Sequence, residues 1–196
     1  MQPVPFRRSL VTPLIAAAVA GGGAITASAP ADTVVGGPLF ADTTWDLAGS
    51  PYVVTSSVLV GVDATLTIDP GVEVRIGPGL GISVGSEGFG GGTLVARGTS
   101  ADPIVFTSSV SAPDVPAAGD WNAITFTPDA EDAVFDGPGG PYLSGSALEH
   151  CVIEFAGGGG TGTGSVTLQQ CRPWIASVTI RDSARAGILG DLVGSP

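Results

Sequence analysis

The residues best suited to catalysis lie late in the chain: Glu149, Glu154, Arg181, Asp182 and Arg185. Hydrolysis of a glycosidic bond needs two carboxylates that flank the bond. A lyase needs a base and a cation that stabilises an enolate-like intermediate. A stacked ion pair between Glu154 and Arg181, worth about 0.2–1 kcal/mol on a sheet surface, is the simpler interpretation. We therefore assign no catalytic residue and keep Glu154, Arg181 and Asp182 as candidate ligand-binding residues.

The single histidine, His150, stands between Glu149 and Cys151 and could serve as an acid/base or as a metal ligand. A protein metal site needs three or four converging ligands, and no other residues have the required spacing. A solvated surface histidine is the better interpretation. We predict no metal site at His150.

The segment from Thr127 to Ser146 is acidic and rich in glycine. Calcium prefers oxygen ligands, and extracellular proteins use it to fix loops. The segment does not match the Asp-x-Asp-x-Asp-Gly pattern of a calcium loop, and clustered acids are usually solvated. We predict no cofactor and keep calcium as the alternative. The four acids concerned are Asp129, Glu131, Asp132 and Asp136.

Two cysteines and three tryptophans complete the candidates. Cys151 and Cys171 could form a disulfide in an exported protein; the alternative is that Cys151 is a small core residue. Trp174 offers an aromatic face on which a pyranose ring could stack. Trp45 is expected to lie in the N-terminal cap.

The composition indicates one packed domain with many turns. The 196 residues include 31 glycines and 16 prolines, yet 43% are hydrophobic and only 13% are charged. This balance is typical of short buried strands joined by tight corners. The chain has seven basic residues, all arginine, and 18 acidic residues, so the net charge is −11. A nucleic-acid partner is therefore not expected, because phosphate binding needs a basic stripe.

Residues 1–31 have the organisation of a signal peptide. Arg7 and Arg8 precede an apolar stretch from Leu10 to Ile25, and small residues suit cleavage after Ala31. The apolar stretch is interrupted by Pro13 and by glycines, so a stable membrane span is the less favoured alternative. We predict that the protein is secreted or held at the cell surface.

The clearest structural signal is the stretch from Val58 to Ile76. Its apolar and polar residues alternate in three short runs, as in strands that bury one face. Corners separate the runs, and at one of them Pro70 fixes its own φ while Gly71 admits a positive φ. Strands this short, joined by corners too short for a helix, predict a polygonal coil.

The motif T-L-T-I-D-P-G-V-E-V, from Thr65 to Val74, resembles the start of bacterial secreted right-handed parallel β-helix proteins of the pectin-lyase-like group. Gly119-Asp120-Trp121 with Ile124 is similar to a second element of these proteins, which implies a structural role for Trp121. The resemblance runs from Trp45 to Gly190 and implies an all-β, single-stranded right-handed parallel β-helix. Because lyases, hydrolases and adhesins share this fold, the resemblance does not imply an activity.

Internal repeats support successive coils. Val58 and Ile82 are 24 residues apart, about one circuit of three strands and three corners, so they should stack at the ~4.8 Å strand spacing. A 27-residue offset aligns residues 148–154 with residues 175–181. We predict coils over residues 58–196, truncated at the C-terminus.

Residues 32–57 are expected to form a lead-in and cap that covers the open end of the first coil. The large apolar residues that would do so are Trp45, Leu47, Tyr52 and Val54. Later, the alternation predicts Ile124 and Phe126 inward and Trp121 on the opposite face. The stretches from Thr107 to Asp120 and from Thr127 to Ser146 should be long loops at the corners, where solenoids often bind their ligands.

These observations favour a secreted or cell-surface β-helix module that is non-catalytic, adhesive or glycan-associated. Its partner would be an extracellular polysaccharide or a cell-surface component. The alternative is a polysaccharide lyase or glycoside hydrolase whose catalytic coils are partly missing. Whether the protein is an enzyme stays open, with the non-catalytic module favoured.

Overall fold

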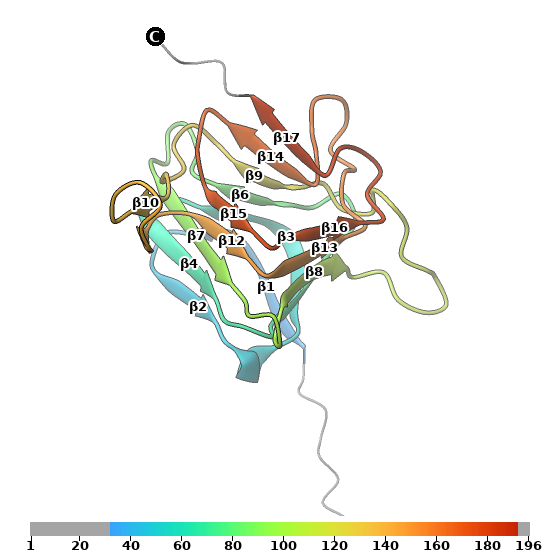
Figure 1. The fold of residues 1–196 in the computed structure, drawn as a ribbon. Coiled ribbons are helices and arrows are strands. Elements are labelled where there is room, and N and C mark those ends of the chain that lie inside the picture. Colours follow the sequence, from blue (N-terminus) through green and yellow to red (C-terminus); the bar gives the residue numbers. More distant parts are fainter. Residues whose placement is uncertain (1–31, 192–196) are drawn as a thin grey trace, which may run out of the picture.

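The computed structural model describes residues 32–191, which form a coil of parallel strands (Figure 1). The predicted signal peptide and the last residues of the chain lie outside the described range. The one helix among the described residues is a 3-10 turn, η1 (Leu47–Gly49). Within residues 32–191, no helix has the length and the hydropathy needed to cross a membrane.

Three faces make up the coil, and each is a stack of parallel strands. Face 1 consists of β2 (Thr43–Trp45), β4 (Ala64–Ile68), β7 (Gly92–Arg97), β12 (Ala147–Glu149) and β15 (Trp174–Ala176). Face 2 consists of the first part of β3 (Tyr52–Val60), β5 (Glu73–Ile76), β8 (Ile104–Ser108), β13 (Cys151–Glu154) and β16 (Thr179–Arg181). Face 3 consists of the last part of β3, β6 (Ile82–Val84), β9 (Ile124–Phe126), β14 (Val166–Gln169) and β17 (Ile188–Asp191). The chain passes through faces 2, 3 and 1 in each circuit.

The register between coils follows the predicted repeats. Val58 pairs with Ile82, and the 27-residue offset pairs Leu148 with Ile175 and Glu154 with Arg181. Alternate residues of most strands are buried, as in β4 and β8, because a strand turns successive side chains to opposite faces. The parallel β-helix is therefore confirmed.

The corners use the backbone conformations that their residues allow. Gly71, in the predicted turn, has φ +80°, a value that glycine adopts without a side-chain clash. Between faces 1 and 2, single residues with positive φ turn the chain, namely His150 at φ +48° and Ser177 at φ +53°. These corners leave no room for a helix, as the sequence indicated.

The coil begins earlier than expected. β1 (Thr33–Leu39) already pairs in parallel with β3, and β2 pairs with β4, so much of the lead-in is coil rather than cap. Trp45 and Tyr52 are buried and stack with their ring centroids 5.1 Å apart. Leu47 lies in the η1 turn and is 60% exposed, so it is not part of a buried cap.

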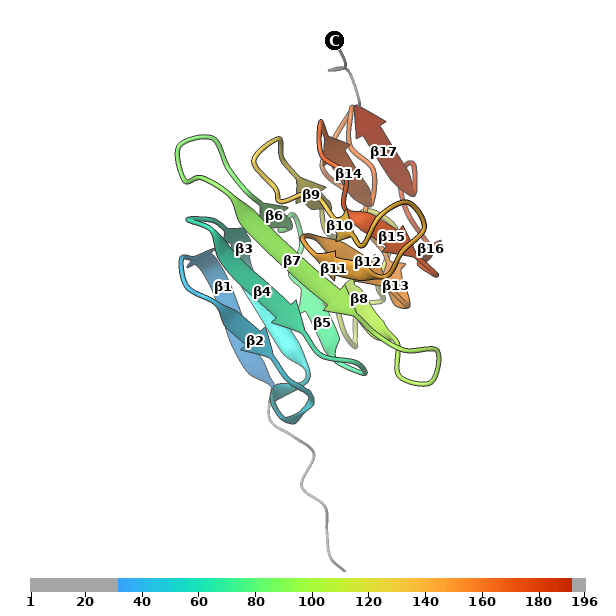
Figure 2. The same ribbon diagram turned by 60° about the vertical axis from the view of Figure 1, so that its left-hand side comes forward.

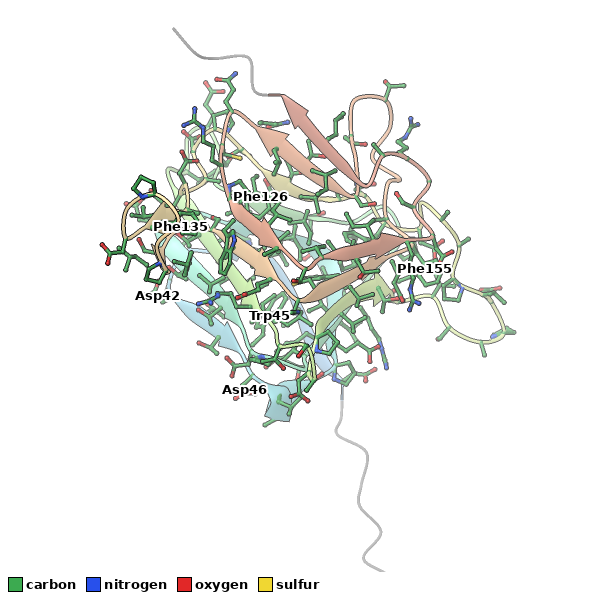
Figure 3. All side chains as sticks on the ribbon, in the orientation of Figure 1. Asp42, Trp45, Asp46, Phe126, Phe135 and Phe155 are labelled. Atoms are coloured by element: carbon green, nitrogen blue, oxygen red, sulfur yellow. The ribbon has the colours of Figure 1, made fainter. Side chains whose placement is uncertain are left out.

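Trp121 is not on an outer face. β9 begins only at Ile124, so the strand alternation does not extend back to Trp121. Its indole is fully buried, and Nε1–H donates to the carbonyl oxygen of Glu154 at 2.7 Å. Ile124 and Phe126 are buried as predicted, and Figure 3 shows Phe126 inside the coil.

Both predicted long loops are present at the corners. The stretch between β8 and β9 leaves the corner between faces 2 and 3. The stretch between β9 and β12 contains a short antiparallel hairpin, β10 (Val134–Phe135) with β11 (Tyr142–Ser144). This hairpin lies against the outside of face 1, next to β7 and β12 (Figure 2).

Candidate functional site

The two glutamates among the residues suited to catalysis do not converge, because the corner at His150 sends them to different faces. Glu149 lies on face 1, where its Oε2 accepts a hydrogen bond from Nε of Arg97 at 2.8 Å. Glu154 lies on face 2, where it pairs with Arg181. The structure therefore offers no carboxylate pair that flanks a common substrate position at these residues.

Glu154 is held on both sides along the outside of face 2. Arg181 donates to Oε1 through Nε at 2.6 Å and also through Nη2, and Thr107 donates to Oε2 from Oγ1 at 3.1 Å. The predicted stacked ion pair is present. Asp182 follows β16 at an exposed corner with φ +53°. Both carboxylate oxygens of Glu154 are occupied, which leaves Glu154 poorly placed to act as a base.

One stacked row on the outside of face 3 contains no acid or base. It consists of Leu59, Ser83, Thr125, Thr167 and Leu189. Thr167 is buried, and its Oγ1 accepts a hydrogen bond from the Gly164 N–H at 3.1 Å. This row is therefore unsuited to acid–base chemistry.

Trp174 belongs to an aromatic cluster outside face 1. It stacks on Tyr142 with ring centroids 5.3 Å apart, and Phe135 meets both rings edge-on. Cζ of Arg97 lies 4.8 Å from the Tyr142 centroid and 5.1 Å from the Trp174 centroid. Figure 3 shows Phe135 on the hairpin, outside the coil. The cluster ties the β10–β11 hairpin to the coil through stacking and cation–π attraction.

A groove of about 480 Å³ runs between face 1 and this hairpin. Its floor is the outer row of β4 and β7, and its wall is the hairpin, with Tyr142 at the junction. Two acids lie at its edge. The lining residues are Thr65, Thr93, Val95, Glu131, Asp132, Val134, Tyr142, Leu143, Ser144 and Gly145. We call this feature the face-1 groove. Its volume is in the range of small-molecule sites in proteins.

Sequence reasoning singled out Trp174 but missed the partners that surround it. Tyr142 and Phe135 were placed in a structureless loop, and Arg97 received no role. The available signal was local: Val134-Phe135 and Tyr142-Leu143 flank a Gly-Pro-Gly-Gly turn, which is the pattern of a hairpin. Burial of the ring raises the pKa of the Tyr142 hydroxyl, while the charge of Arg97 acts in the opposite direction.

The acids of the insertion are only partly gathered. Asp129, Glu131 and Asp132 line a hollow at the corner between faces 3 and 1, whereas Asp136 lies in the hairpin turn. Oδ1 of Asp132 accepts a hydrogen bond from the backbone N–H of Arg172 at 2.6 Å. Over residues 32–191, no three histidine, cysteine or acidic side chains converge in a way that could hold a metal ion.

His150 is a corner residue rather than a strand residue. Its backbone N–H donates to the Ala176 oxygen at 3.1 Å, and its oxygen accepts from the Ile104 N–H at 3.1 Å. These bonds join three successive coils. The imidazole is half-buried. The backbone of His150 therefore has a structural role that does not depend on the imidazole.

The two cysteines, Cys151 and Cys171, are free, buried thiols. Sγ of Cys151 contacts the Ala96 oxygen at 3.4 Å, and Sγ of Cys171 contacts the Phe126 oxygen at 3.4 Å. Cys151 occupies an inward slot of β13, which matches the alternative interpretation as a core residue. Burial raises the pKa of the Cys151 thiol to about 12 and also raises that of Cys171.

We expect both thiols to resist iodoacetamide in the native protein at neutral pH. The thiolate is the nucleophile, and the ordinary pKa of 9.0 is raised to about 12 at Cys151, so little thiolate is present there at neutral pH and alkylation should keep rising with pH up to about 12. Mass spectrometry after denaturation without reductant should then count two alkylated cysteines. A count of zero would show that a disulfide joins Cys151 and Cys171.

Residues 37–132 match the family described as the pectate-lyase-like β-helix domain. The matched region spans the first coils, the floor of the face-1 groove and the two acids at its edge. No curated protein and no solved structure matches the chain.

Proposed function

Because residues 37–132 belong to the pectate-lyase-like β-helix family, we propose that the protein is a non-catalytic, glycan-binding module that is secreted or displayed at the cell surface. The observation that carries the proposal is the face-1 groove. The exported location rests on the signal-peptide pattern of residues 1–31.

The lining of the face-1 groove suits a sugar chain. A pyranose has an apolar face that packs on aromatic and aliphatic groups, and hydroxyls that exchange hydrogen bonds with polar side chains. The groove supplies Tyr142, Val95 and Leu143 for the first role and the hydroxyls of Thr65 and Thr93 for the second. Because the floor is a strand surface, it presents these groups in rows at the ~4.8 Å spacing between coils.

Rigidity supports binding at this groove. Thr65 pairs with Thr93 in the ladder between β4 and β7, so the floor is part of the hydrogen-bonded sheet. The wall is fixed by the stack of Tyr142 on Trp174 and by the hydrogen bond from the Tyr142 hydroxyl to the Gly145 oxygen at 2.5 Å. A preformed site loses less conformational entropy when it binds a ligand.

A non-catalytic role agrees with the separation of Glu149 from Glu154. Glu149 and Glu154 face opposite sides of a corner, and each carboxylate already binds an arginine. A glycosidase needs two carboxyl groups about 5–10 Å apart around one bond. These two side chains are instead committed to separate ion pairs.

Filling the groove floor tests the proposal. In Thr93→Tyr, the new ring would occupy the groove on a strand that tolerates aromatic residues. Affinity electrophoresis first identifies a polysaccharide that retards the wild-type protein. We expect Thr93→Tyr to weaken binding to that polysaccharide by about tenfold or more, which is about 1.4 kcal/mol. The matched control, Thr179→Tyr, makes the same change on the exposed outside of β16 and should leave retardation unchanged.

Three results would contradict the proposal. One is equal retardation of both variants, which would place binding elsewhere. Another is release of unsaturated uronides or reducing sugars that Arg181→Ala abolishes, which would favour the enzyme. Retardation by no polysaccharide at all would also remove the glycan-binding role.

A further inference from the structure

Arg97 contacts the aromatic wall of the face-1 groove from outside, since it is not among the residues that line the groove. Its Cζ atom and the ring centroids of Tyr142 and Trp174 form a triangle with sides of 4.8, 5.1 and 5.3 Å. The planar, delocalised cation of arginine is well suited to stacking on aromatic faces. One guanidinium group therefore attracts both rings at once.

The hairpin that carries Tyr142 depends on such side-chain contacts. In the described part of the chain, the hydrogen bonds of residues 134–144 join the hairpin to itself or to Gly145. Backbone bonds reach the coil at the two ends of the hairpin, where the Ala133 N–H donates to the Arg172 oxygen and the Trp174 N–H donates to the Ser146 oxygen. A two-stranded hairpin is marginally stable by itself in water. The position of Tyr142 is therefore set by the side chains that it meets on the coil.

Glu149 orients Arg97 toward the rings. The two residues are partners in the parallel ladder between β7 and β12, and Nε of Arg97 donates to Oε2 of Glu149 at 2.8 Å. This bond restrains a guanidinium group that would otherwise move freely on a long, flexible stem. A cation that is already fixed loses less conformational entropy when it holds the two rings.

We infer that Arg97 is a positioning residue for the face-1 groove. Held by Glu149, it fixes Tyr142 as the wall, so that a charge outside the groove controls the affinity for a glycan inside it. Trp174 supplies the second contact to Tyr142 and also lies outside the groove lining. This inference rests on the proposed glycan-binding function and adds how the affinity of that site is controlled.

Substitutions of Arg97 test the inference with the polysaccharide that retards the wild-type protein. Arg97→Met keeps a long, unbranched side chain and removes the charge. We expect it to weaken binding by about three- to tenfold, as the loss of a partly exposed cation–π contact implies. Arg97→Lys keeps the charge without the planar group, so its binding should lie between those of Arg97→Met and the wild type.

Arg75→Met is the matched control. Arg75 also pairs with a glutamate, Glu73, and its side chain is 38% exposed, compared with 41% for Arg97. This pair lies on the outside of face 2, away from the hairpin. We expect Arg75→Met to bind the polysaccharide as the wild-type protein does.

Two further measurements separate positioning from a general loss of stability. If Arg97 acts through Tyr142, Arg97→Met should have no further effect on binding once Tyr142→Leu has removed the ring. Hydrogen exchange of the protein alone needs no glycan. Exchange of residues 134–144 should rise in Arg97→Met and stay at the wild-type level in Arg75→Met.

The outcomes distinguish this inference from the proposed function. Wild-type binding by Arg97→Met would overturn the inference and leave the glycan-binding module in place, and faster hairpin exchange in that variant would then show that Arg97 stabilises the hairpin without controlling affinity. Additive losses from Arg97→Met and Tyr142→Leu would also overturn it, because Arg97 would then act by a route other than Tyr142. If no polysaccharide retards the wild-type protein, the proposed function fails and the control of its affinity fails with it.

Discussion

Trp121→Ala is expected to lower the free energy of unfolding by about 3–5 kcal/mol, the cost of emptying a large aromatic site in a core. Trp121 is among the largest fully buried side chains and belongs to the main hydrophobic cluster. It also donates a hydrogen bond to the Glu154 oxygen at the end of β13. The substitution therefore leaves both a cavity and an unpaired carbonyl. Urea denaturation followed by circular dichroism measures the change.

A conservative variant separates packing from hydrogen bonding at this site. Trp121→Phe keeps most of the ring and loses the N–H donor, so it should lower the free energy of unfolding by about 1–3 kcal/mol. If Trp121→Ala lowered the free energy of unfolding by less than about 1 kcal/mol, residue 121 would not join β9 to β13. Such a result would restore the interpretation of Trp121 as an outward-facing residue.

Gly145→Ala is expected to detach the β10–β11 hairpin and to abolish binding in the face-1 groove. Gly145 has φ +91°, and a Cβ there would overlap the backbone oxygen of Asp132. Backbone cannot yield as a flexible side chain can, so Ser144 and Asp132 must separate. The groove then loses its wall, since Tyr142, Leu143 and Ser144 all belong to the hairpin. Hydrogen exchange of residues 134–144 should rise while the strands of the coil stay protected.

The hairpin contains its own control for this experiment. Gly139 also has a positive φ, +77°, but a Cβ there would meet nothing within 4 Å. Gly139→Ala should therefore cost only about 1 kcal/mol of backbone strain and leave glycan binding intact. If Gly145→Ala and Gly139→Ala showed the same hydrogen exchange and the same glycan binding, the contact between Gly145 and Asp132 would not be what holds the hairpin.

Several features of the fold were predictable because they are local or periodic. The alternation in β4 and β5 and the turn at Gly71 are encoded within a few residues. The stacking of Glu154 over Arg181 follows from a repeat offset, because each coil rests directly on the one before it. The same reasoning was wrong for Trp121, because this residue precedes β9 and strand alternation does not apply outside the strand.

The candidate site was only partly predictable. Trp174 was recognised by residue type, but its role in fixing the hairpin depends on Arg97 and Tyr142, which are far away in the sequence. Similarly, the insertion was seen to be acidic, while the approach of Glu131 to Asp63 depends on the glycine between them. No pattern within one coil contains these contacts.

The sequence by itself determined a parallel β-helix and the register of its coils, since short-range alternation and a regular repeat specify both. Only the tertiary structure decided where the ionisable groups gather. The corner at His150 separated Glu149 from Glu154, and the folding back of one insertion created the face-1 groove. These outcomes follow from long-range packing at corners, where loop length and direction break the repeat and the period of the strands no longer applies.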